Sequence, residues 1–366
     1  VNAAAVLDRL RELRARRVHE SSAWRLTALG VDVFQATVRF VGAGQLGLVS
    51  SDNSASECHF ERAVILDSPS PSEFRSEVFG DIAVRLPAWL LEMPRLPRRV
   101  AMLGGGPDEC ELGQALRRLG SDVHLLVPEH SLLAGEEPWI SKIVERQFEH
   151  EEIRLHLGVR VVRTDRTGDS KGLVVERGNA RQKILVDEIF AANRCAVSDA
   201  LDFAAAGIRV SPAGIEVDRH LRTTNRNVFA AGATSGIVTD AGDTNNGLAV
   251  LAIENATSAR MRLRSIQDVP RRIHVDPQIV HLGTTFSNAG DRRALNSIRL
   301  PFERPPCPRL CDGVEPAALA YLDHGRMVGM TLVGLQSEDL RVDGPPAGLK
   351  SMLSRSRRNG MLSLLG

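Results

Sequence analysis

The sequence predicts an α/β protein built around a wound parallel sheet. An apolar run over Val100–Leu103 leads directly into three glycines at 104–106, and apolar residues at helical spacing then continue to Gly120. The same alternation of a short apolar run with a helical pattern repeats through residues 122–157. Strands and helices that alternate in this way over about 60 residues are typical of right-handed βαβ units, whose strands lie parallel.

Length and composition limit the classes of protein that this chain can be. Its 366 residues correspond to roughly two to three domains. Lysine and arginine number 46 against 45 aspartate and glutamate, so the net charge of +1 provides no positive field for nucleic acid. No run of about 18 apolar residues occurs, and charged residues at 8, 9 and 11 come too early for a secretory signal. We therefore expect no nucleic-acid partner and no membrane.

The cysteines favour a reducing compartment. They are odd in number and scattered, without the density of a secreted disulfide scaffold, so we expect a cytoplasmic protein. Two of them lie close together in a proline-rich segment, but no further cysteine or histidine with zinc-ligand spacing lies nearby. We therefore assign no metal site. The five are Cys58, Cys110, Cys195, Cys307 and Cys311.

The regions on either side of the predicted sheet have other patterns. Residues 1–29 have the narrow apolar stripe of an amphipathic helix, and residues 31–65 alternate in short runs typical of a β-meander. Residues 201–264 contain short strands and a glycine-rich turn, with a helix expected from Gly247 to Leu263. The last hundred or so residues carry runs with hairpin spacing, and His324-Gly325 is expected at the tip of one hairpin.

The run Gly104-Gly105-Gly106-Pro107 is the sharpest local signal for a ligand. Small residues there let the backbone approach a pyrophosphate, and the N-terminus of the next helix favours an anion. However, Glu109 takes the third small position of the G-x-G-x-x-G pattern, where its bulk and charge both oppose phosphate. Val127 stands where a carboxylate normally accepts from the ribose, so no preference between NAD and NADP is encoded. The turn is either a nicotinamide site or a turn retained without a ligand.

Two further residues of the same helix have alternative interpretations. Glu111 is either a carboxylate near the reacting rings of a bound dinucleotide or an ordinary first-turn acid favoured by the helix dipole. Cys110 is expected to be a small packing residue, because no second cysteine and no base lie near it in the sequence.

Five blocks of the chain, in order, resemble the pyridine nucleotide-disulfide oxidoreductases. The blocks are GGGPDECELGQALRRLGSDVHLL, EHEEIRLHLGVRVVR, AAGIRVSPAGIEVD with LRTTNRNVFAAG, HVDPQIVHLG, and GRMVGMTLVG. The resemblance extends from about residue 3 to residue 340 and is nearest to the branch of mercuric reductase and dihydrolipoamide dehydrogenase. Several blocks in a fixed order are a far more specific signal than one glycine motif.

The resemblance implies a fold and a domain order. It implies a Rossmann-like nicotinamide domain inserted in a truncated FAD/NAD(P)-binding domain, followed by an α+β dimerisation-type domain. Residues 1–97 correspond to part of the first flavin segment, residues 98–190 to the NAD(P)-binding domain, and residues 191–270 to the second flavin segment. Residues 271–366 correspond to a shortened dimerisation-type domain, from which a homodimer is expected.

The same resemblance implies cofactors and the residues that contact them. Members of the family pass a hydride from NAD(P)H through FAD to an acceptor, so both cofactors are expected. The glycine run at 104–107 and Glu111 correspond to the nicotinamide side, and Gly232 and Ala233 correspond to the flavin side. The opening glycine fingerprint for FAD and the CxxxxC redox pair would lie before Val1, so no catalytic residue is assigned.

Several motifs inside the matched region depart from the family. Leu66-Asp67-Ser68 and Ala192-Asn193-Arg194 replace turns of the A-T-G type that approach the flavin. Ala233 replaces the acid that accepts a hydrogen bond from the sugar-alcohol chain of the flavin, and a methyl group cannot do so. After Leu340 the chain has no histidine to correspond to the acid and base of the family's disulfide reducers.

Three hypotheses for the function follow from these observations. The first is an oxidoreductase that depends on FAD and NAD(P)H and resembles mercuric reductase. The second is a degenerate, non-catalytic relative that acts as a binding or interaction protein, since cofactor-facing positions changed while the cores stayed apolar. The third is one part of a split flavoenzyme, with a separate N-terminal FAD segment that docks on the helix around Val6 to Val18. Flavin bound to the purified chain separates the first hypothesis from the second.

Overall fold

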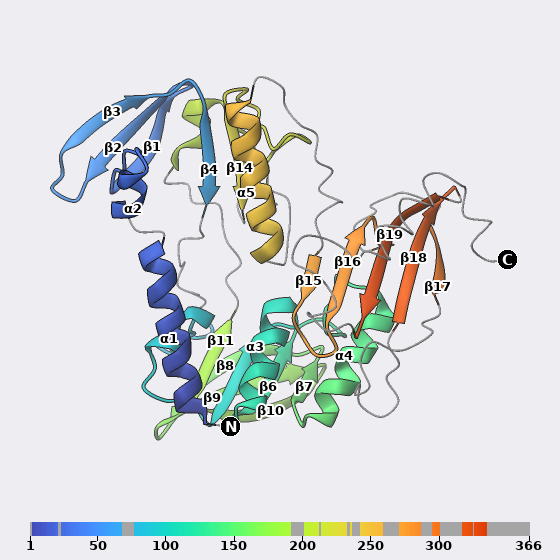
Figure 1. Cartoon of the computed structure of the whole chain (residues 1–366). Coiled ribbons are helices and arrows are strands. Elements are labelled where there is room, and N and C mark those ends of the chain that lie inside the picture. Colours follow the sequence, from blue (N-terminus) through green and yellow to red (C-terminus); the bar gives the residue numbers. More distant parts are fainter. Residues whose placement is uncertain are drawn as a thin grey trace.

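The computed structural model of the chain contains a four-stranded parallel sheet, called the central sheet below, which lies in the lower part of the view in Figure 1. Its strand order is β11-β5-β6-β7, and helices α3 and α4 connect β5 to β6 and β6 to β7, which confirms the predicted alternation. These elements are β5 (Arg99–Leu103), α3 (Pro107–Arg118), β6 (Asp122–Val127), α4 (Pro138–His150), β7 (Arg154–Leu157) and β11 (Glu188–Ala191). The structure describes residues 2–20, 23–67, 77–191, 201–211, 214–232, 235, 242–258, 271–286, 295–300, 317–324 and 326–334.

Both faces of this sheet are covered, as parallel sheets require. On one face, alternate residues of β6 such as Val123 and Leu125 pack with Ile140 and Phe148 of α4, and all four side chains are fully buried. The other face packs against an antiparallel sheet of order β10-β9-β8, with Leu126 in the shared core. Its strands are β8 (Arg160–Thr167), β9 (Ser170–Arg177) and β10 (Ala180–Val186).

A second parallel sheet joins segments that precede and follow the central sheet in the sequence. β4 (Ala63–Asp67) pairs in parallel with β14 (Val228–Gly232), with Ile65 opposite Ala230. Helix α5 (Gly242–Thr257) covers one face, and Phe40 and Phe203 belong to the core on the other. The segments flanking the central sheet therefore share one small sheet, as the sequence predicts for an inserted unit.

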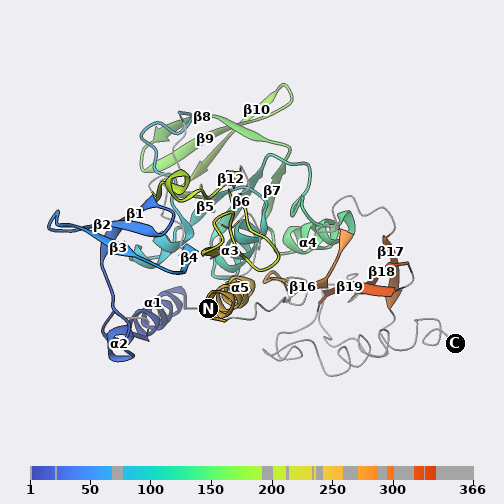
Figure 2. The ribbon, with the colours of Figure 1, turned by 90° about the horizontal axis from the view of Figure 1, so that it is seen from above.

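The N-terminal region lies against the side of the molecule opposite the C-terminal sheet (Figure 2). Strands β1 (Ala36–Gly42), β2 (Gln45–Ser50) and β3 (Ala55–His59) pair antiparallel in that order, which confirms the predicted β-meander over these residues. Its expected end at residue 65 is wrong, because Ile65 belongs to β4, which pairs in parallel with β14 in a separate sheet. The predicted amphipathic helix forms as α1 (Ala3–Glu20), followed by α2 (Ala23–Ala28). Arg11 of α1 donates to the carbonyl of Leu91 at 2.9 Å, which ties α1 to the short helix η1 (Pro87–Glu92).

The C-terminal region forms an antiparallel sheet of order β15-β16-β19-β18-β17. Asp323 of β18 pairs with Arg326 of β19, which confirms the predicted hairpin, and His324 next to Asp323 adopts a φ of 48°. Gly325 lies outside the described residues. The strands are β15 (Arg271–Ile273), β16 (Ile279–Gly283), β17 (Leu295–Leu300), β18 (Ala317–Asp323) and β19 (Arg326–Val333). The remaining short elements are η3 (Phe203–Ala206), β12 (Val210–Ser211) and β13 (Gly214–Ile215).

Both expected boundaries of one helix are wrong. Helix α5 begins at Gly242 rather than at Gly247, and it ends at Thr257 rather than at Leu263. Residues 243–246 are all polar, so the apolar periodicity gave no sign of the first turn. Cys307, Cys311 and the residues after 334 lie outside the described residues.

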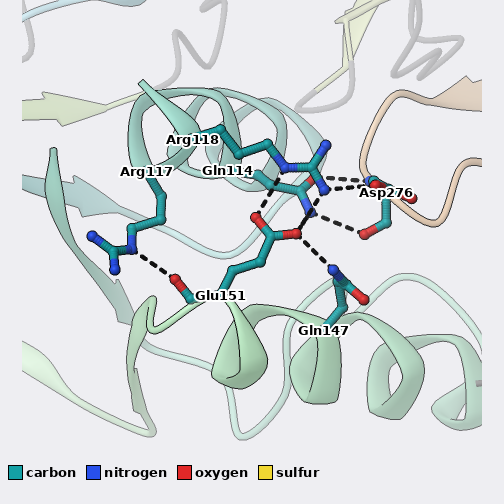
Figure 3. A network of polar contacts seen from close by, with 6 residues as sticks. All are labelled: Gln114, Arg117, Arg118, Gln147, Glu151 and Asp276. Atoms are coloured by element: carbon teal, nitrogen blue, oxygen red, sulfur yellow. Dashed lines mark hydrogen bonds and ion pairs between the residues drawn. The ribbon is translucent and has the colours of Figure 1, made fainter. Parts of the chain in front are cut away.

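A polar network fixes the C-terminal sheet to α3 and α4 (Figure 3). The carboxylate of Glu151, just after α4, accepts hydrogen bonds from Gln114 at 2.8 Å, Gln147 at 2.7 Å and Arg118 at 2.6 Å. Arg118 also forms an ion pair with Asp276 at 2.6 Å, in the loop between β15 and β16. Gln114 and the backbone of Asp276 exchange hydrogen bonds of 2.8 and 2.9 Å. The Glu151 carboxylate thus links α4 to α3, and Arg118 and Gln114 of α3 link this pair to the loop between β15 and β16.

Candidate functional site

The glycine turn lies at the carboxyl end of β5, directly before α3. Gly104 has a φ of +125°, a region that disfavours side chains, and its N–H donates to the carbonyl of Leu126 at 2.9 Å. Gly106 is the N-cap of α3, and Pro107 occupies the first helical turn. This places the turn at the end of the sheet where wound folds bind ligands, with the positive end of a helix dipole beside it.

The middle of the turn is packed tightly against the neighbouring strand. A β-carbon on Gly105 would lie 2.7 Å from a methyl of Val127 and 3.2 Å from Leu132. The carbonyl of Gly105 accepts from the N–H of Leu133 at 2.7 Å. Val127 itself is fully buried, so the end of β6 offers packing and no carboxylate for a ribose. Glycine at 105 is therefore required by the fold, whether or not a ligand binds.

Glu109 lies over the turn. It is the third residue of α3, a position from which glutamate reaches back toward the helix N-terminus, and it is only 9% exposed. A β-carbon on Gly104 would lie 3.0 Å from its carboxyl carbon, and one on Gly106 would lie 2.9 Å from Oε2. The backbone of the turn suits a pyrophosphate, but the Glu109 carboxylate fills the space beside both outer glycines. A dinucleotide does not fit until this side chain moves.

Glu111 and Cys110 have partners within the protein. The Glu111 carboxylate accepts from the backbone N–H of His274 at 2.7 Å, which links α3 to the start of the C-terminal sheet. Burial raises the pKa of Glu111 above its usual value, and the His274 N–H opposes this rise. Cys110 is fully buried, and burial, reinforced by the nearby Glu109 charge, raises the pKa of its thiol. Cys110 thus has the properties of a packing residue.

The second predicted site lies at the carboxyl ends of β4 and β14. Gly232 ends β14 opposite Asp67 and has a φ of +103°, a region that disfavours side chains. Ala233 and the run 192–194 lie outside the described residues. The assignment of Gly232 and Ala233 to a flavin therefore stays a prediction.

Comparison with known proteins points to one family. The family model described as pyridine nucleotide-disulphide oxidoreductase matches residues 87–261, which include the glycine turn, the central sheet, β14 and α5. This match, over just under half of the chain, supports the predicted resemblance to the pyridine nucleotide-disulfide oxidoreductases. Members of this family are oxidoreductases that depend on FAD and NAD(P).

Similar proteins include both enzymes named by the resemblance. The chain is 25% identical to a dihydrolipoyl dehydrogenase of Bacillus subtilis over 261 residues, covering 71% of this chain and 56% of that enzyme. It is 30% identical to a mercuric reductase of Bacillus cereus over 212 residues, covering 56% of this chain and 32% of that enzyme. The chain thus matches about half or less of the length of these relatives.

Two solved structures have the same fold as this chain. The flavoprotein disulfide reductase RclA from Escherichia coli superposes with a TM-score of 0.72 at 20% identity, covering 96% of this chain and 79% of that chain. LpdA from Mycobacterium tuberculosis superposes with a TM-score of 0.76 at 18% identity, covering 98% of this chain and 78% of that chain. The predicted fold, an inserted Rossmann-like domain in an FAD/NAD(P)-type domain followed by an α+β domain, is confirmed.

The sequence analysis missed a buried polar cluster between the segment before α4 and the C-terminal sheet. Glu136, before α4, lies 3.0 Å from Nε2 of His281 and 2.5 Å from Arg271. Nδ1 of His281 lies 2.8 Å from Thr331 Oγ1, which in turn lies 2.9 Å from the Tyr321 hydroxyl. Burial alone raises the pKa of Glu136, but His281 and Arg271 outweigh it and lower the pKa. These residues are too far apart in sequence for a local pattern to reveal the cluster.

Membrane-spanning helices and clusters of metal ligands were searched for in the described residues. None of the helices there is long and apolar enough to cross a lipid bilayer. Among the same residues, no three or more histidines, cysteines or carboxylates gather in an arrangement that could hold a metal ion.

Proposed function

We propose that the chain forms the nicotinamide-type and flavin-type portion of a FAD-dependent, mercuric reductase-like oxidoreductase that takes electrons from NAD(P)H for a small acceptor. The main support for this proposal is the arrangement of the two parallel sheets of the chain. The unit with the glycine turn is inserted between β4 and β14, which pair with each other, so two nucleotide-type strand ends occur in the order of the family. FAD, when bound, supplies the electron-accepting ring.

The flavin-type sheet has an open edge. Among the described residues, β4 pairs with β14 alone, and Leu66 at the end of β4 is 49% exposed. Two parallel strands rarely suffice for a stable sheet, and parallel sheets need helices on both faces. The proposal therefore includes a first flavin segment that adds its strand to the edge of β4. This segment belongs either to a longer form of this chain or to a separate polypeptide.

Flavin binding tests the proposal. Two proteins are purified: the chain alone, and the chain fused to the first flavin segment of the matching Bacillus cereus mercuric reductase. Each is saturated with FAD, and unbound FAD is then removed. We expect flavin near one per fused chain, with oxidation of NADH or NADPH by an artificial acceptor. Absence of flavin from both proteins contradicts the proposal.

A pair of glycine variants locates the flavin. Gly232→Ala is expected to lower the flavin content severalfold, because its φ of +103° disfavours a side chain at the carboxyl end of β14. Gly120→Ala is the matched control, since Gly120 has a φ of +104° with open space around its β-carbon position. Equal losses in both variants would indicate backbone strain and not a flavin contact.

A second candidate function is a non-catalytic family member that binds a partner through the retained scaffold. The position of Glu109 favours it, because the carboxylate lies where the electron donor would bind. A folded chain that takes up FAD yet shows no NAD(P)H oxidation in any fusion supports this candidate over the first.

A further inference from the structure

We propose that Glu109 is a built-in occupant of the glycine turn, holding a carboxylate where the pyrophosphate of a dinucleotide would lie and thereby weakening NAD(P)H binding. The inference rests on the proposed function, because it takes the turn to be the dinucleotide site. It assigns to Glu109 the role of setting the affinity of that site.

The first step is the position of the carboxylate. Its atoms come within 3.0 Å of the β-carbon position of Gly104 and 2.9 Å of that of Gly106, so it spans the two outer glycines. The neighbouring acid in the same turn, Asp108, is exposed, whereas Glu109 is 9% exposed. The Glu109 side chain is therefore folded onto the turn, although the first turn of a helix leaves room for an acid to point outward.

The second step is the chemistry of the turn. Its glycines and the N-terminus of α3 favour an anion, and an internal carboxylate satisfies the same preference as a phosphate. The two anions compete for one space and repel each other at contact distance. The internal carboxylate is covalently attached, so it competes at a high effective concentration.

The third step is that Glu109 is not needed to bring α3 onto the sheet. The close approach of helix and sheet occurs one turn later, at Gly113, where a β-carbon would lie 3.4 Å from Leu125 and 3.6 Å from Val123. The β5–α3–β6 core is thus formed by residues other than Glu109. Removal of the Glu109 side chain should open the turn and leave the fold intact.

The test compares four proteins of 366 residues: the unchanged chain, Glu109→Ala, Glu109→Gln and Asp108→Ala. Dissociation constants for NADH and NADPH are measured by titration calorimetry, and folding is checked by circular dichroism and thermal melting. We expect Glu109→Ala to tighten binding by about tenfold or more, since both charge and bulk are removed. Glu109→Gln should tighten it about threefold, because only the charge is lost, and Asp108→Ala should stay within about twofold.

The outcomes separate this inference from the proposed function. If the unchanged chain binds NAD(P)H and folded Glu109→Ala binds no tighter, the inference is overturned while the proposed function stands. If Glu109→Ala binds inorganic pyrophosphate but no variant binds NAD(P)H, the internal occupant is supported and the proposed electron donor is contradicted. If no protein binds either ligand, both fail. If Glu109→Ala does not fold, the affinity of Glu109→Gln for NAD(P)H is compared with that of the unchanged chain instead, and binding no tighter than that of the unchanged chain overturns the inference.

Discussion

The two parallel sheets of this chain differ in their number of strands and in how deeply their residues are buried. The central sheet has four strands, and residues such as Val100 and Val123 in its interior are fully buried. The flavin-type sheet has two, and β4 carries half-exposed Leu66 beside only partly buried Val64 and Ile65. The sheet bearing the glycine turn thus has its own core, whereas the other is a fragment of a larger sheet. Stability and function need not depend on the same parts of the molecule.

The largest effect is expected in the core of the central sheet. Phe148→Ala removes a fully buried ring from that core, so it should lower the free energy of unfolding by about 3–5 kcal/mol. Urea denaturation followed by tryptophan fluorescence measures this, since Trp139 packs against the same core. A loss below about 1 kcal/mol would show that the central sheet is not the more stable unit.

The next effect concerns the carboxylate that ties the central sheet to the C-terminal sheet. Burial by itself raises the pKa of Glu151, but hydrogen bonds from Arg118 and Gln147 outweigh it, so the pKa is lowered. Its stabilising effect is therefore present above the unfolded pKa near 4.3 and is lost as the pH falls through the folded value. Glu151→Gln should cost about 1–3 kcal/mol at pH 7 and flatten this acid dependence.

A matched control for that variant is Glu149→Gln, on an exposed position of the same helix. Its effect should stay within about 0.5 kcal/mol. Similar losses in the two variants would contradict a specific role for the network of Figure 3.

A third prediction concerns the edge of the central sheet, where two histidines meet. Nε2 of His124 lies 3.0 Å from the Arg154 guanidinium, which can only donate, so the other nitrogen carries the proton and donates to His156 at 3.0 Å. Burial, with the His156 and Arg154 charges, lowers the pKa of His124 to about 4. Since the unfolded histidine titrates near 6.5, stability should be complete above that pH and fall between about 6.5 and 4.

Protonation of His124 should lower the free energy of unfolding by about 1–2 kcal/mol over this pH range, once solvent screening is allowed for. His124→Leu should flatten the stability profile between these pH values in urea denaturation. A profile as steep as that of the unchanged chain would assign the pH dependence to other groups.

The smallest effect is expected at the open edge of the flavin-type sheet. Leu66→Ala should cost about 0.5–1 kcal/mol in the chain alone, because half of the side chain is already exposed. The cost should rise in the fusion that carries a first flavin segment, where Leu66 becomes covered. The same small cost in both proteins would mean that the added segment does not pair with β4.

The sequence predicted well those elements that depend on local patterns. The alternation from β5 to β7 and the hairpin around His324 follow from apolar periodicity and turn residues, and both are confirmed. The pairing of β4 with β14 joins residues far apart in sequence, so only the resemblance to the family indicated it. At the site, the chemistry of Glu109 predicted a conflict with phosphate, but its placement over the turn needed three-dimensional coordinates.

The polar cluster beneath the C-terminal sheet gives the molecule an optical reporter of its own. Tyr321 is the one tyrosine in the chain; its hydroxyl donates to Glu137 and lies 2.9 Å from Oγ1 of Thr331. Burial, followed by the bond to Glu137, raises the pKa of Tyr321 above its usual value. An alkaline ultraviolet titration therefore follows a single phenol, and its ionisation at an ordinary pH would signal that the C-terminal sheet has separated from the segment before α4.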